Sequence, residues 1–299
     1  MAGDKGNLTS MRSLGPMSRL ALERPVPGGP PRILASAGTL EVRLATTSEE
    51  ICRAQELRYC VFFQEGGAVA DQAARLIGRD VCRFDRVCDH LIVVDNSVAR
   101  LDGPPAVVGA YRLLRQEVAE VNYGFYSARE FQVGSLIARH PGRRFLELGR
   151  SCVARGYRSK RTIELLWRGI WGYASWHGVD AMFGCASFPG VDAKAHAMTM
   201  RFLHGEDEID ALWRVDALAS HAVADGRSEE AQLAPREALR AMPPLIKGYW
   251  RLGAKFSRDA VVDRRFGTTD LFVVLPTEEI KLRYLAYFAP ERESAPLAA

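Results

Sequence analysis

The segment that decides the fold reads FLELGRSCVARGYRSKRTIELLW and runs from Phe145 to Trp167. It begins as an apolar strand, continues as a basic loop and ends as a helix. Two charged residues, Glu147 and Arg150, interrupt the strand, and a regular strand sends residues three apart to opposite faces. A bulge near Gly149 would bring both side chains to one face and would splay the strand. The segment therefore predicts a bent core strand with two opposite charges at one place.

Cations are concentrated around this segment. Between residues 139 and 168 there are nine Lys or Arg against two Glu, whereas the formal net charge of the whole chain is only +4. The loop ends where a helix is expected to begin, and the free N–H groups and dipole of a helix N-terminus attract anions. A phosphate is therefore the favoured partner, with a solvated loop that binds nothing as the alternative. Nucleic acid is disfavoured because the aromatic residues here, Trp167 and Trp171, fall on the apolar stripe of the helix.

The rest of the chain alternates between strand and helix patterns. Strands are expected where apolar residues run together or alternate, at residues 40–45, 89–95, 106–114, 179–186 and 268–276. Helices are expected where apolar residues recur at intervals of three and four, at residues 48–63 with Ser48 as N-cap, 161–178, 192–204, 243–252 and 278–288. This order predicts a mixed α/β fold.

A single main domain is expected from the 299 residues, because no internal linker rich in Pro, Gly or Ser divides them. Residues 1–38, with repeated Pro and Gly and few large apolar residues, are interpreted as a disordered lead. The domain is expected to span residues 39–290, followed by a tail at 291–299. Residues 206–241 are polar and weakly periodic, so they are interpreted as an insertion or excursion.

The cysteines and apolar runs indicate a cytoplasmic protein, or at most one peripheral to the inner face of the membrane. The six cysteines form no close CxxC pair, and no apolar run approaches the roughly 20 residues that span a bilayer. Cys82, Cys88 and His90 lack a second pair of ligands, so no metal is expected. No permanently bound cofactor is expected either.

The loop before the helix resembles the acyl-donor site of the GNAT (Gcn5-related N-acyltransferase) fold, in which Arg/Gln-x-x-Gly-x-Gly/Ala cradles a phosphate. The resemblance implies a central twisted mixed sheet flanked by helices, with a splayed strand. Here YRSKRT places Ser159 and Arg161 where glycines are usual. Fewer glycines and more cations favour the phosphopantetheine arm of an acyl carrier protein over coenzyme A as the donor. The residues expected to hold that arm are Arg155, Arg158, Ser159, Lys160 and Arg161.

A closer resemblance covers residues 40 to about 275, in order. LRYCVFFQE, FDRVCDHLIVVD, VVGAYRLLRQ, GFYSAREF, FLELGRSCV, YRSKRTIELLWRGIW, GCASFPG and FGTTDLFVVLP resemble the bacterial L-ornithine Nα-acyltransferase family, which is distantly similar to acyl-homoserine-lactone synthases. The resemblance implies transfer of a 3-hydroxyacyl chain from acyl carrier protein to the α-amine of ornithine, giving lyso-ornithine lipid. Cys82, where an acidic residue is usual, and Ala110, where Thr is common, depart from the pattern.

The candidate site residues follow from charge and from this resemblance. Glu147 is a candidate base or ligand of the ammonium group, and Arg150 a partner of the substrate carboxylate or of Glu147. A diamino acid also calls for carboxylates in its pocket. The further candidates for substrate binding are Arg58, Phe62, Asp80, Asp85, Asp89 and Arg112, of which Arg112 is hard to dismiss inside an apolar strand.

Three alternatives stay open. Glu147 and Arg150 could form a buried ion pair without a chemical role. The same chemistry could act on glutamine, lysine or glycine, or make a signalling lactone. A binding module for anionic lipid or nucleic acid, without catalysis, is the alternative of another class.

Overall fold

A computed structural model describes residues 32–98, 105–204, 211–223 and 234–280. One sheet of nine strands runs through them in the order β1-β2-β3-β4-β5-β6-β9-β8-β7. The strands are β1 (Ile33–Ala37), β2 (Leu40–Leu44), β3 (Asp89–Asp95), β4 (Ala106–Arg115), β5 (Phe145–Val153), β6 (Ala181–Pro189), β7 (Ala222–Val223), β8 (Lys255–Asp263) and β9 (Thr268–Pro276). Within the described ranges, β5 and β6 form the one parallel pair and all other neighbours are antiparallel. This arrangement confirms the expected mixed α/β, GNAT-like fold.

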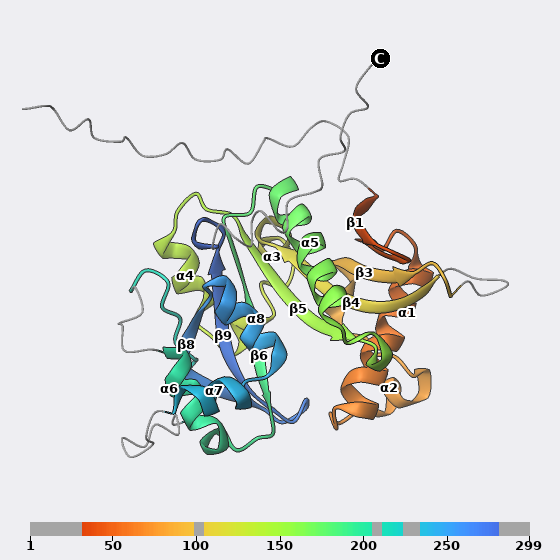
Figure 1. Ribbon diagram of the computed structural model, residues 1–299. Coiled ribbons are helices and arrows are strands. Elements are labelled where there is room, and N and C mark those ends of the chain that lie inside the picture. Colours follow the sequence, from red (N-terminus) through yellow and green to blue (C-terminus); the bar gives the residue numbers. More distant parts are fainter. Residues whose placement is uncertain (1–31, 99–104, 205–210, 224–233, 281–299) are drawn as a thin grey trace, which may run out of the picture.

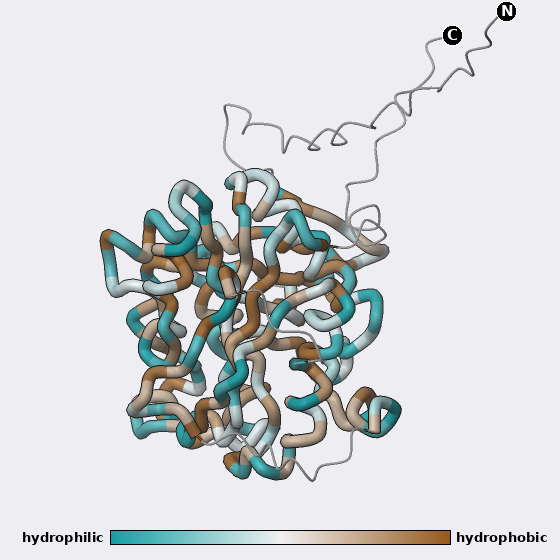
Figure 2. The backbone as a smooth tube through the Cα atoms, turned by 90° about the vertical axis from the view of Figure 1, so that its left-hand side faces the viewer, coloured by the Kyte–Doolittle hydropathy of each residue, from teal (hydrophilic) through white to brown (hydrophobic). Residues whose placement is uncertain are grey.

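Helices cover both faces of the sheet (Figure 1). They are α1 (Ser48–Tyr59), α2 (Gln72–Ile77), α3 (Gln116–Glu120), α4 (Val133–Arg139), α5 (Lys160–Trp176), α6 (Ala197–His204), α7 (Pro235–Ala241) and α8 (Pro244–Leu252). Successive residues of β3 sort by face: Leu91 and Val93 belong to the core under α5 and α8, whereas Ile92 and Val94 pack with Ala54 of α1. This alternation is what a strand buried on both faces requires. In Figure 2 the hydrophobic stretches of the chain run through the interior.

The long helix α5 begins and packs as its sequence predicts. Ser159 is the N-cap and its hydroxyl accepts a hydrogen bond from the Thr162 N–H at 3.3 Å. Gly169 faces the sheet, and a Cβ there would lie 2.5 Å from a methyl carbon of Val42. The absence of a side chain therefore lets α5 approach β2 closely.

The two central strands separate halfway along their length. Pairing between β5 and β6 covers Phe145–Glu147 against Ala181–Phe183 and ends there, although both strands continue for six more residues. At the next position a Cβ on Gly184 would lie 2.3 Å from the carbonyl oxygen of Leu148. Only glycine fits at this close approach, which lies directly after the last paired residues of β5 and β6.

The expected bulge in β5 is confirmed. Ala110 pairs with Cys152 and Arg112 with Gly149, so β5 has one residue more than β4 over this stretch. Arg150 adopts a left-handed backbone conformation with φ 54°, which is uncommon for residues other than glycine. The bulge and this turn bring the Glu147 and Arg150 side chains to one cavity, described below.

Several boundaries differ from those expected from sequence. The interpretation of residues 1–38 as disordered is wrong for 33–37, which form β1 against β2; residues 1–31 lie outside the described part. Thr47, not Ser48, caps α1 and forms a capping box with Glu50. After α1 the chain continues as a π-helical segment, η1 (Cys60–Glu65). Residues 192–204 are confirmed as helical, as a 3₁₀ turn followed by α6.

Two regions of the second half were misread. β8 was not expected, because Lys255, Arg258 and Asp259 obscure the alternation of apolar and polar residues that would predict a strand near the sheet edge. The supposed excursion at 206–241 packs into the domain where it is described, since Trp213 is buried and β7 pairs with β8. Residues 206–210 and 224–233, and nearly all of the helix expected at 278–288, lie outside the described residues.

The close approach at Gly184 gives a first prediction. Gly184→Ala should lower the free energy of unfolding by about 2–3 kcal/mol, because the added methyl group meets backbone that cannot yield. The melting temperature should fall by roughly 5–10 °C for a chain of this size. Calorimetry measures both.

Gly248→Ala in α8 is the control, since its Cβ would lie 3.9 Å from the nearest atom, the Trp167 indole nitrogen. It should leave the melting temperature unchanged or slightly raised, because Ala favours helix over Gly. Equal stability of the two variants would show that the backbone around Gly184 leaves room for a methyl group.

Candidate active site

A cavity of about 260 Å³ lies where β5 and β6 part. One wall comes from β5 with Glu147 and Arg150, and the opposite wall from β6 and β9 with Ser187 and Asp270. Phe62 of η1 and Phe266 of the β8–β9 turn close it with their rings, whose centroids are 5.7 Å apart. A cavity with apolar rings and a few convergent charged groups has the character of a small-molecule site.

Glu147 is the buried carboxylate of the β5 wall, with 4% of its surface exposed. It accepts hydrogen bonds from the N–H groups of Tyr126 and Ser127, each at 2.7 Å, and one from the Ser127 hydroxyl. Burial raises the pKa of Glu147 above its usual value, although the donors at Ser127 and Tyr126 and the charge of Arg112 oppose the shift. A carboxyl group with a raised pKa at a cavity wall is suited to accepting a proton near neutral pH.

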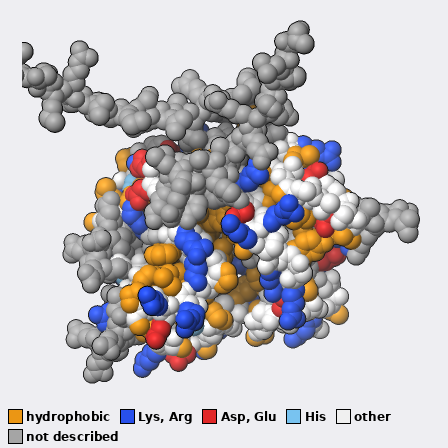
Figure 3. All heavy atoms as spheres, viewed as in Figure 1, with side chains coloured by type: hydrophobic (Ala, Val, Ile, Leu, Met, Phe, Trp, Pro, Cys, Tyr) orange, Lys and Arg blue, Asp and Glu red, His pale blue; other side chains and the backbone are white. Residues whose placement is uncertain are grey.

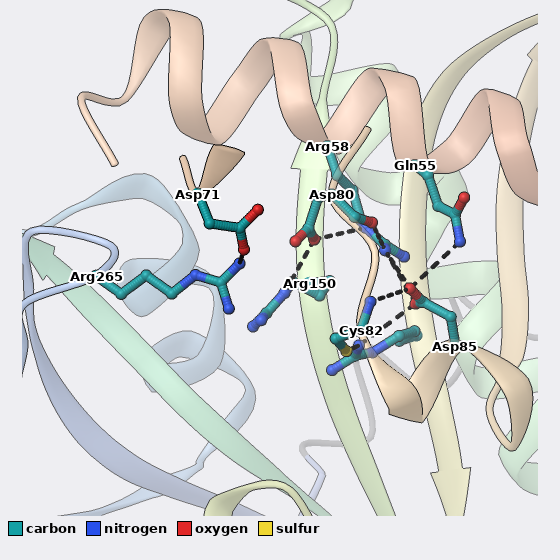
Figure 4. Close-up of polar contacts among 9 residues, drawn as sticks. Gln55, Arg58, Asp71, Asp80, Cys82, Asp85, Arg150 and Arg265 are labelled. Carbon is teal, nitrogen blue, oxygen red and sulfur yellow. Dashed lines mark hydrogen bonds and ion pairs between the residues drawn. The ribbon is translucent and has the colours of Figure 1, made fainter. Parts of the chain in front are cut away.

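Arg150 does not pair with Glu147. Its Nε donates to Asp80 at 3.2 Å, and its guanidinium lies 4.4 Å from the ring centroid of Phe266 and 4.9 Å from that of Tyr126. Figure 4 shows the far end of the guanidinium turned away from Asp80. The cation is thus fixed by one carboxylate and two rings, with its terminal nitrogens placed at the cavity that it lines.

A buried ionic network lies behind Arg150. Arg58, 1% exposed, donates to Asp80 at 2.9 Å and to Asp85 at 2.9 Å, and Figure 4 shows it between the two carboxylates. Arg112 lies 3.4 Å from Asp85. Burial opposes ionisation of Asp85, but the charges of Arg58 and Arg112 outweigh it and hold its pKa below the usual value. The network links α1 and the loop before β3 to β4 and to β5 through Arg150.

The structure brings together most of the predicted polar-substrate residues. Phe62, Arg112, Glu147 and Arg150 line the cavity, while Arg58 with Asp80 and Asp85 supports it from behind. Asp89 does not join them: it pairs with Arg115 at 3.6 Å and accepts a hydrogen bond from the Tyr173 hydroxyl. The expectation that Asp89 shares this cluster is therefore wrong, because its side chain leaves β3 on the side of α5.

The cations before α5 are exposed, as expected of a docking loop. Lys160 is 89% exposed at its side chain and pairs with Glu164 at 3.3 Å. Arg158 is held by the Val153 carbonyl at 3.0 Å and by Glu65 at 2.6 Å. Arg155 and Arg161 are exposed too. Figure 3 shows Lys and Arg side chains in several groups over the face that carries α5, with fewer acidic ones between them.

Sequence reasoning missed part of the cavity. Tyr126 and Ser127, which hold Glu147, belong to the GFYSAREF block but were not singled out. Asp270 interrupts the apolar strand TTDLFVVLP, which is the same signal that identified Arg112. The remaining cavity residues that were not expected are Gly66, Leu148, Ser151, Cys185, Leu245, Asp263, Phe266 and Thr268.

Cys82, Cys88 and His90 do not form a group with metal-ligand spacing in the described part of the chain. His90 bonds the Asp85 carbonyl oxygen at 2.9 Å, and burial raises the pKa of the Cys88 thiol to about 12. In the described part of the chain, the group with metal-ligand spacing is instead Glu130, Cys185 and Asp270, whose ligand atoms lie within 4.8 Å of one another.

Comparison with known proteins identifies first the class and then the family. The family model "Acetyltransferase (GNAT) domain" matches residues 57–168, which include β3, β4, the bulged β5 and the first half of α5. This match identifies a GNAT acetyltransferase domain in that part of the chain, and the splayed sheet agrees with it.

Curated relatives named L-ornithine N(alpha)-acyltransferase extend the match over most of the chain. The protein from Agrobacterium fabrum is 53% identical over 86% of this chain and 87% of its own length, and that from Rhizobium meliloti 50% identical over 89% and 90%. The solved structure of FeeM, an N-acyl amino acid synthase from uncultured soil microbes, has a TM-score of 0.45 at 9% identity, over 80% of this chain and 92% of that one. The chain belongs to the L-ornithine N(alpha)-acyltransferase family.

The buried network gives a second prediction. Asp80→Asn should cost about 3–5 kcal/mol of unfolding free energy, because it leaves Arg58 and Arg150 buried without their shared counter-charge. Urea denaturation measures the loss.

Asp71→Asn is the matched control. Asp71 pairs with Arg265 at 3.5 Å on the surface, and Asn keeps its role as N-cap of α2, so the cost should stay within about 1 kcal/mol. If both variants lost the same small amount, the network would not hold the site in place.

Proposed function

We propose that the protein transfers a 3-hydroxyacyl chain from acyl carrier protein to the α-amine of L-ornithine, giving lyso-ornithine lipid. The observation that carries this proposal is the cavity between the splayed strands, which the Glu147 carboxyl and the Arg150 cation both line. Acyl transfer needs a nucleophile and a thioester held together, a proton acceptor and a donor for the oxyanion. Family membership supports the choice of ornithine.

The residues divide the chemistry among them. Arg150 binds the α-carboxylate through nitrogens that Asp80 leaves free. Glu147 accepts the proton that the α-amine loses, directly or through water, as the amine attacks the thioester carbonyl. Backbone N–H groups of β5 beyond the end of its pairing with β6 donate to the developing oxyanion. The tetrahedral intermediate then expels the thiol of the carrier, and an amide remains.

The basic loop delivers the acyl donor. The phosphate of the phosphopantetheine arm binds at the N-terminus of α5, and Arg155, Arg158, Lys160 and Arg161 contact the acidic surface of the carrier protein. Ser159 contributes by capping the helix, because its hydroxyl is taken by Thr162. No cofactor is bound permanently in this scheme.

The setting follows from substrate and product. Within the described ranges, no helix is both long and apolar enough to cross a membrane. We place the enzyme in the cytoplasm, where acyl carrier protein and ornithine are found, with contact to the inner face of the membrane when the lipid product leaves.

Release of free carrier thiol on adding an amino acid tests the function. Purified protein is incubated with 3-hydroxyacyl carrier protein and a panel of ornithine, lysine, glutamine and glycine, and the lipid product is read by mass spectrometry. Ornithine should give the highest rate. If only another amino acid of the panel gave thiol release, that amino acid would take the place of ornithine as the substrate. If no amino acid gave thiol release, the protein would be a binding module without catalysis.

The third prediction concerns Glu147. Glu147→Gln should reduce kcat by roughly 10²–10⁴, the range for loss of a general base. Because burial raises the pKa of Glu147, the wild-type rate should climb with pH through that raised value as the carboxyl ionises, and the Gln variant should lack this rise. Any fall in rate at low pH that remains in the Gln variant is due to protonation of the substrate α-amine.

Measuring thiol release from pH 5 to 9 gives the rates of the wild type and of the Gln variant. The melting temperature of the variant serves as the control for folding. Wild-type turnover in a folded Gln variant would remove Glu147 from the mechanism.

The fourth prediction concerns the loop. Replacing Arg158, Lys160 and Arg161 together by Ala should raise KM for acyl carrier protein at least tenfold and leave KM for ornithine within about twofold, because the cations face the carrier and not the cavity. Arg236, Arg240 and Arg251, which are exposed on α7 and α8, form a control triple with the same change of charge. Equal KM for the carrier in the two triples would refute the role of the loop.

A further inference from the structure

The cavity has a second polar wall that the proposed chemistry does not use. Asp270 of β9 lines it, opposite the β5 wall, and Asp263 and Ser187 lie on the same side. The Asp263 carboxylate is occupied by the turn that follows it, because its Oδ1 accepts from the N–H groups of Arg265 at 2.8 Å and Phe266 at 3.0 Å. The Oδ1 atom of Asp270 accepts no such hydrogen bond among the described residues.

Asp270 is a buried carboxylate with an unused oxygen. Only 6% of the residue is exposed, and Oδ1 has no hydrogen-bond partner among the described residues. Leaving a buried acceptor unsatisfied is costly, so such an atom calls for a ligand. The six residues of β9 that follow it, Leu271–Pro276, are apolar, which indicates that the carboxylate is not there for packing.

A second carboxylate supports Asp270 from behind. Ligand atoms of Glu130, Cys185 and Asp270 lie within 4.8 Å of one another, and the Cys185 thiol donates to Glu130 at 3.9 Å. Across from this acidic end, the other wall carries Arg112 and Arg150 beside Glu147. The cavity thus has its arginines on one wall and only acids among the charged groups of the other, which matches a molecule with a carboxylate at one end and an ammonium at the other.

We propose that Asp270, backed by Glu130, binds the side-chain ammonium of ornithine and so selects diamino acids over neutral ones. This inference rests on the proposed function and assigns its specificity. With the α-carboxylate at Arg150, the α-amine lies beside Glu147 and the δ-ammonium reaches the β6–β9 wall. The acids that the sequence suggested for this task are taken: Asp80 and Asp85 by Arg58, and Asp89 by Arg115.

The pair Asp270 and Glu130, called the ammonium seat below, suits an ammonium group better than a metal ion. An ammonium needs only acceptors, which Asp270 and Glu130 supply. A metal would need the Cys185 thiolate, and burial together with the charges of Asp270 and Glu130 raises the pKa of that thiol well above its usual value. The metal is nevertheless kept as an outcome of the test below.

The seat predicts how specificity depends on pH. Burial raises the pKa of Asp270 to about 6, although Thr268 and Ser187 lower it. Burial, together with the charges of Asp270 and Asp263, raises the pKa of Glu130 to about 7. The cations that lower these values are Arg150 for both groups and Arg129 for Glu130. Both carboxyls therefore gain charge between pH 5 and 8, where the δ-ammonium stays protonated. Preference for ornithine should rise over this range.

The experiment compares ornithine with L-norvaline, which has the same carbon chain without the δ-amine. Asp270→Asn should lower kcat/KM for ornithine about 10- to 100-fold, as expected for loss of a charged hydrogen bond. It should leave kcat/KM for norvaline within about threefold. The ratio of the two substrates cancels effects on Glu147 and on the α-amine, so its collapse supports the seat and an unchanged ratio overturns it.

Further variants protect the test from misfolding. Glu130→Gln should lower the same ratio by a smaller factor, and Glu237→Gln, exposed on α7, is the control that should leave it unchanged. If Asp270→Asn fails to fold, two other measurements test the proposal: the ornithine-to-norvaline ratio of kcat/KM in Glu130→Gln, and the same ratio in the wild type from pH 5 to 8. A ratio that changes neither with the substitution nor with pH overturns the ammonium seat. Loss of ornithine turnover in EDTA that Zn²⁺ restores would overturn it in favour of a metal site. Absence of any thiol release with ornithine in the wild type is a different result, since it refutes the proposed function itself.

Discussion

The separation of β5 from β6 is the constraint on which the rest of the molecule depends. Parallel strands that stayed paired to their ends would fill the sheet and leave no cavity. Pairing stops at Glu147, beside the point where Gly184 lies against the Leu148 carbonyl with no room for a side chain, and the bulge at Arg150 turns β5 away from its neighbour. The extra residue of the bulge thus bends β5 at the centre of a sheet that is otherwise continuous, and the glycine permits the close backbone approach beside it.

Keeping that gap open requires a rigid frame, and buried charge provides it. Arg58 and Asp80 hold Arg150 from the α1 side, while Tyr126 and Ser127 hold Glu147 from below. Each is buried and hydrogen-bonded, so neither charge is free to collapse onto the other across the gap. The Glu–Arg pair that the sequence suggested would have neutralised the site. By giving each charge a separate partner, the fold leaves both available to a substrate.

The sequence predicted the fold well where periodicity was strong. α5, β3, β4 and β9 follow from runs of apolar residues, and the bulge follows from the spacing of Glu147 and Arg150. β8 could not be found, because a strand near the sheet edge needs few apolar residues and Lys255, Arg258 and Asp259 obscure its alternation. β1 was hidden for a related reason: its five residues stand next to a Pro-rich lead and become partly buried only through pairing with β2 and packing under α5.

The site shows a sharper limit of the same reasoning. A charged residue in an apolar strand identified Arg112 and Glu147, yet that criterion also applied to Asp270, which was passed over. What distinguishes Asp270 from Asp80, Asp85 and Asp89 is the absence of an ion pair with an arginine among the described residues, and sequence records residue types but not which charges have found one another. Clusters of acids close in sequence are the ones most easily neutralised by nearby arginines, as Asp80 and Asp85 are by Arg58. Asp270, carried by a distant strand, forms no ion pair among the described residues although Glu130 lies close to it in the fold. The absence of an ion pair, more than proximity in sequence to other acids, therefore marks a binding group.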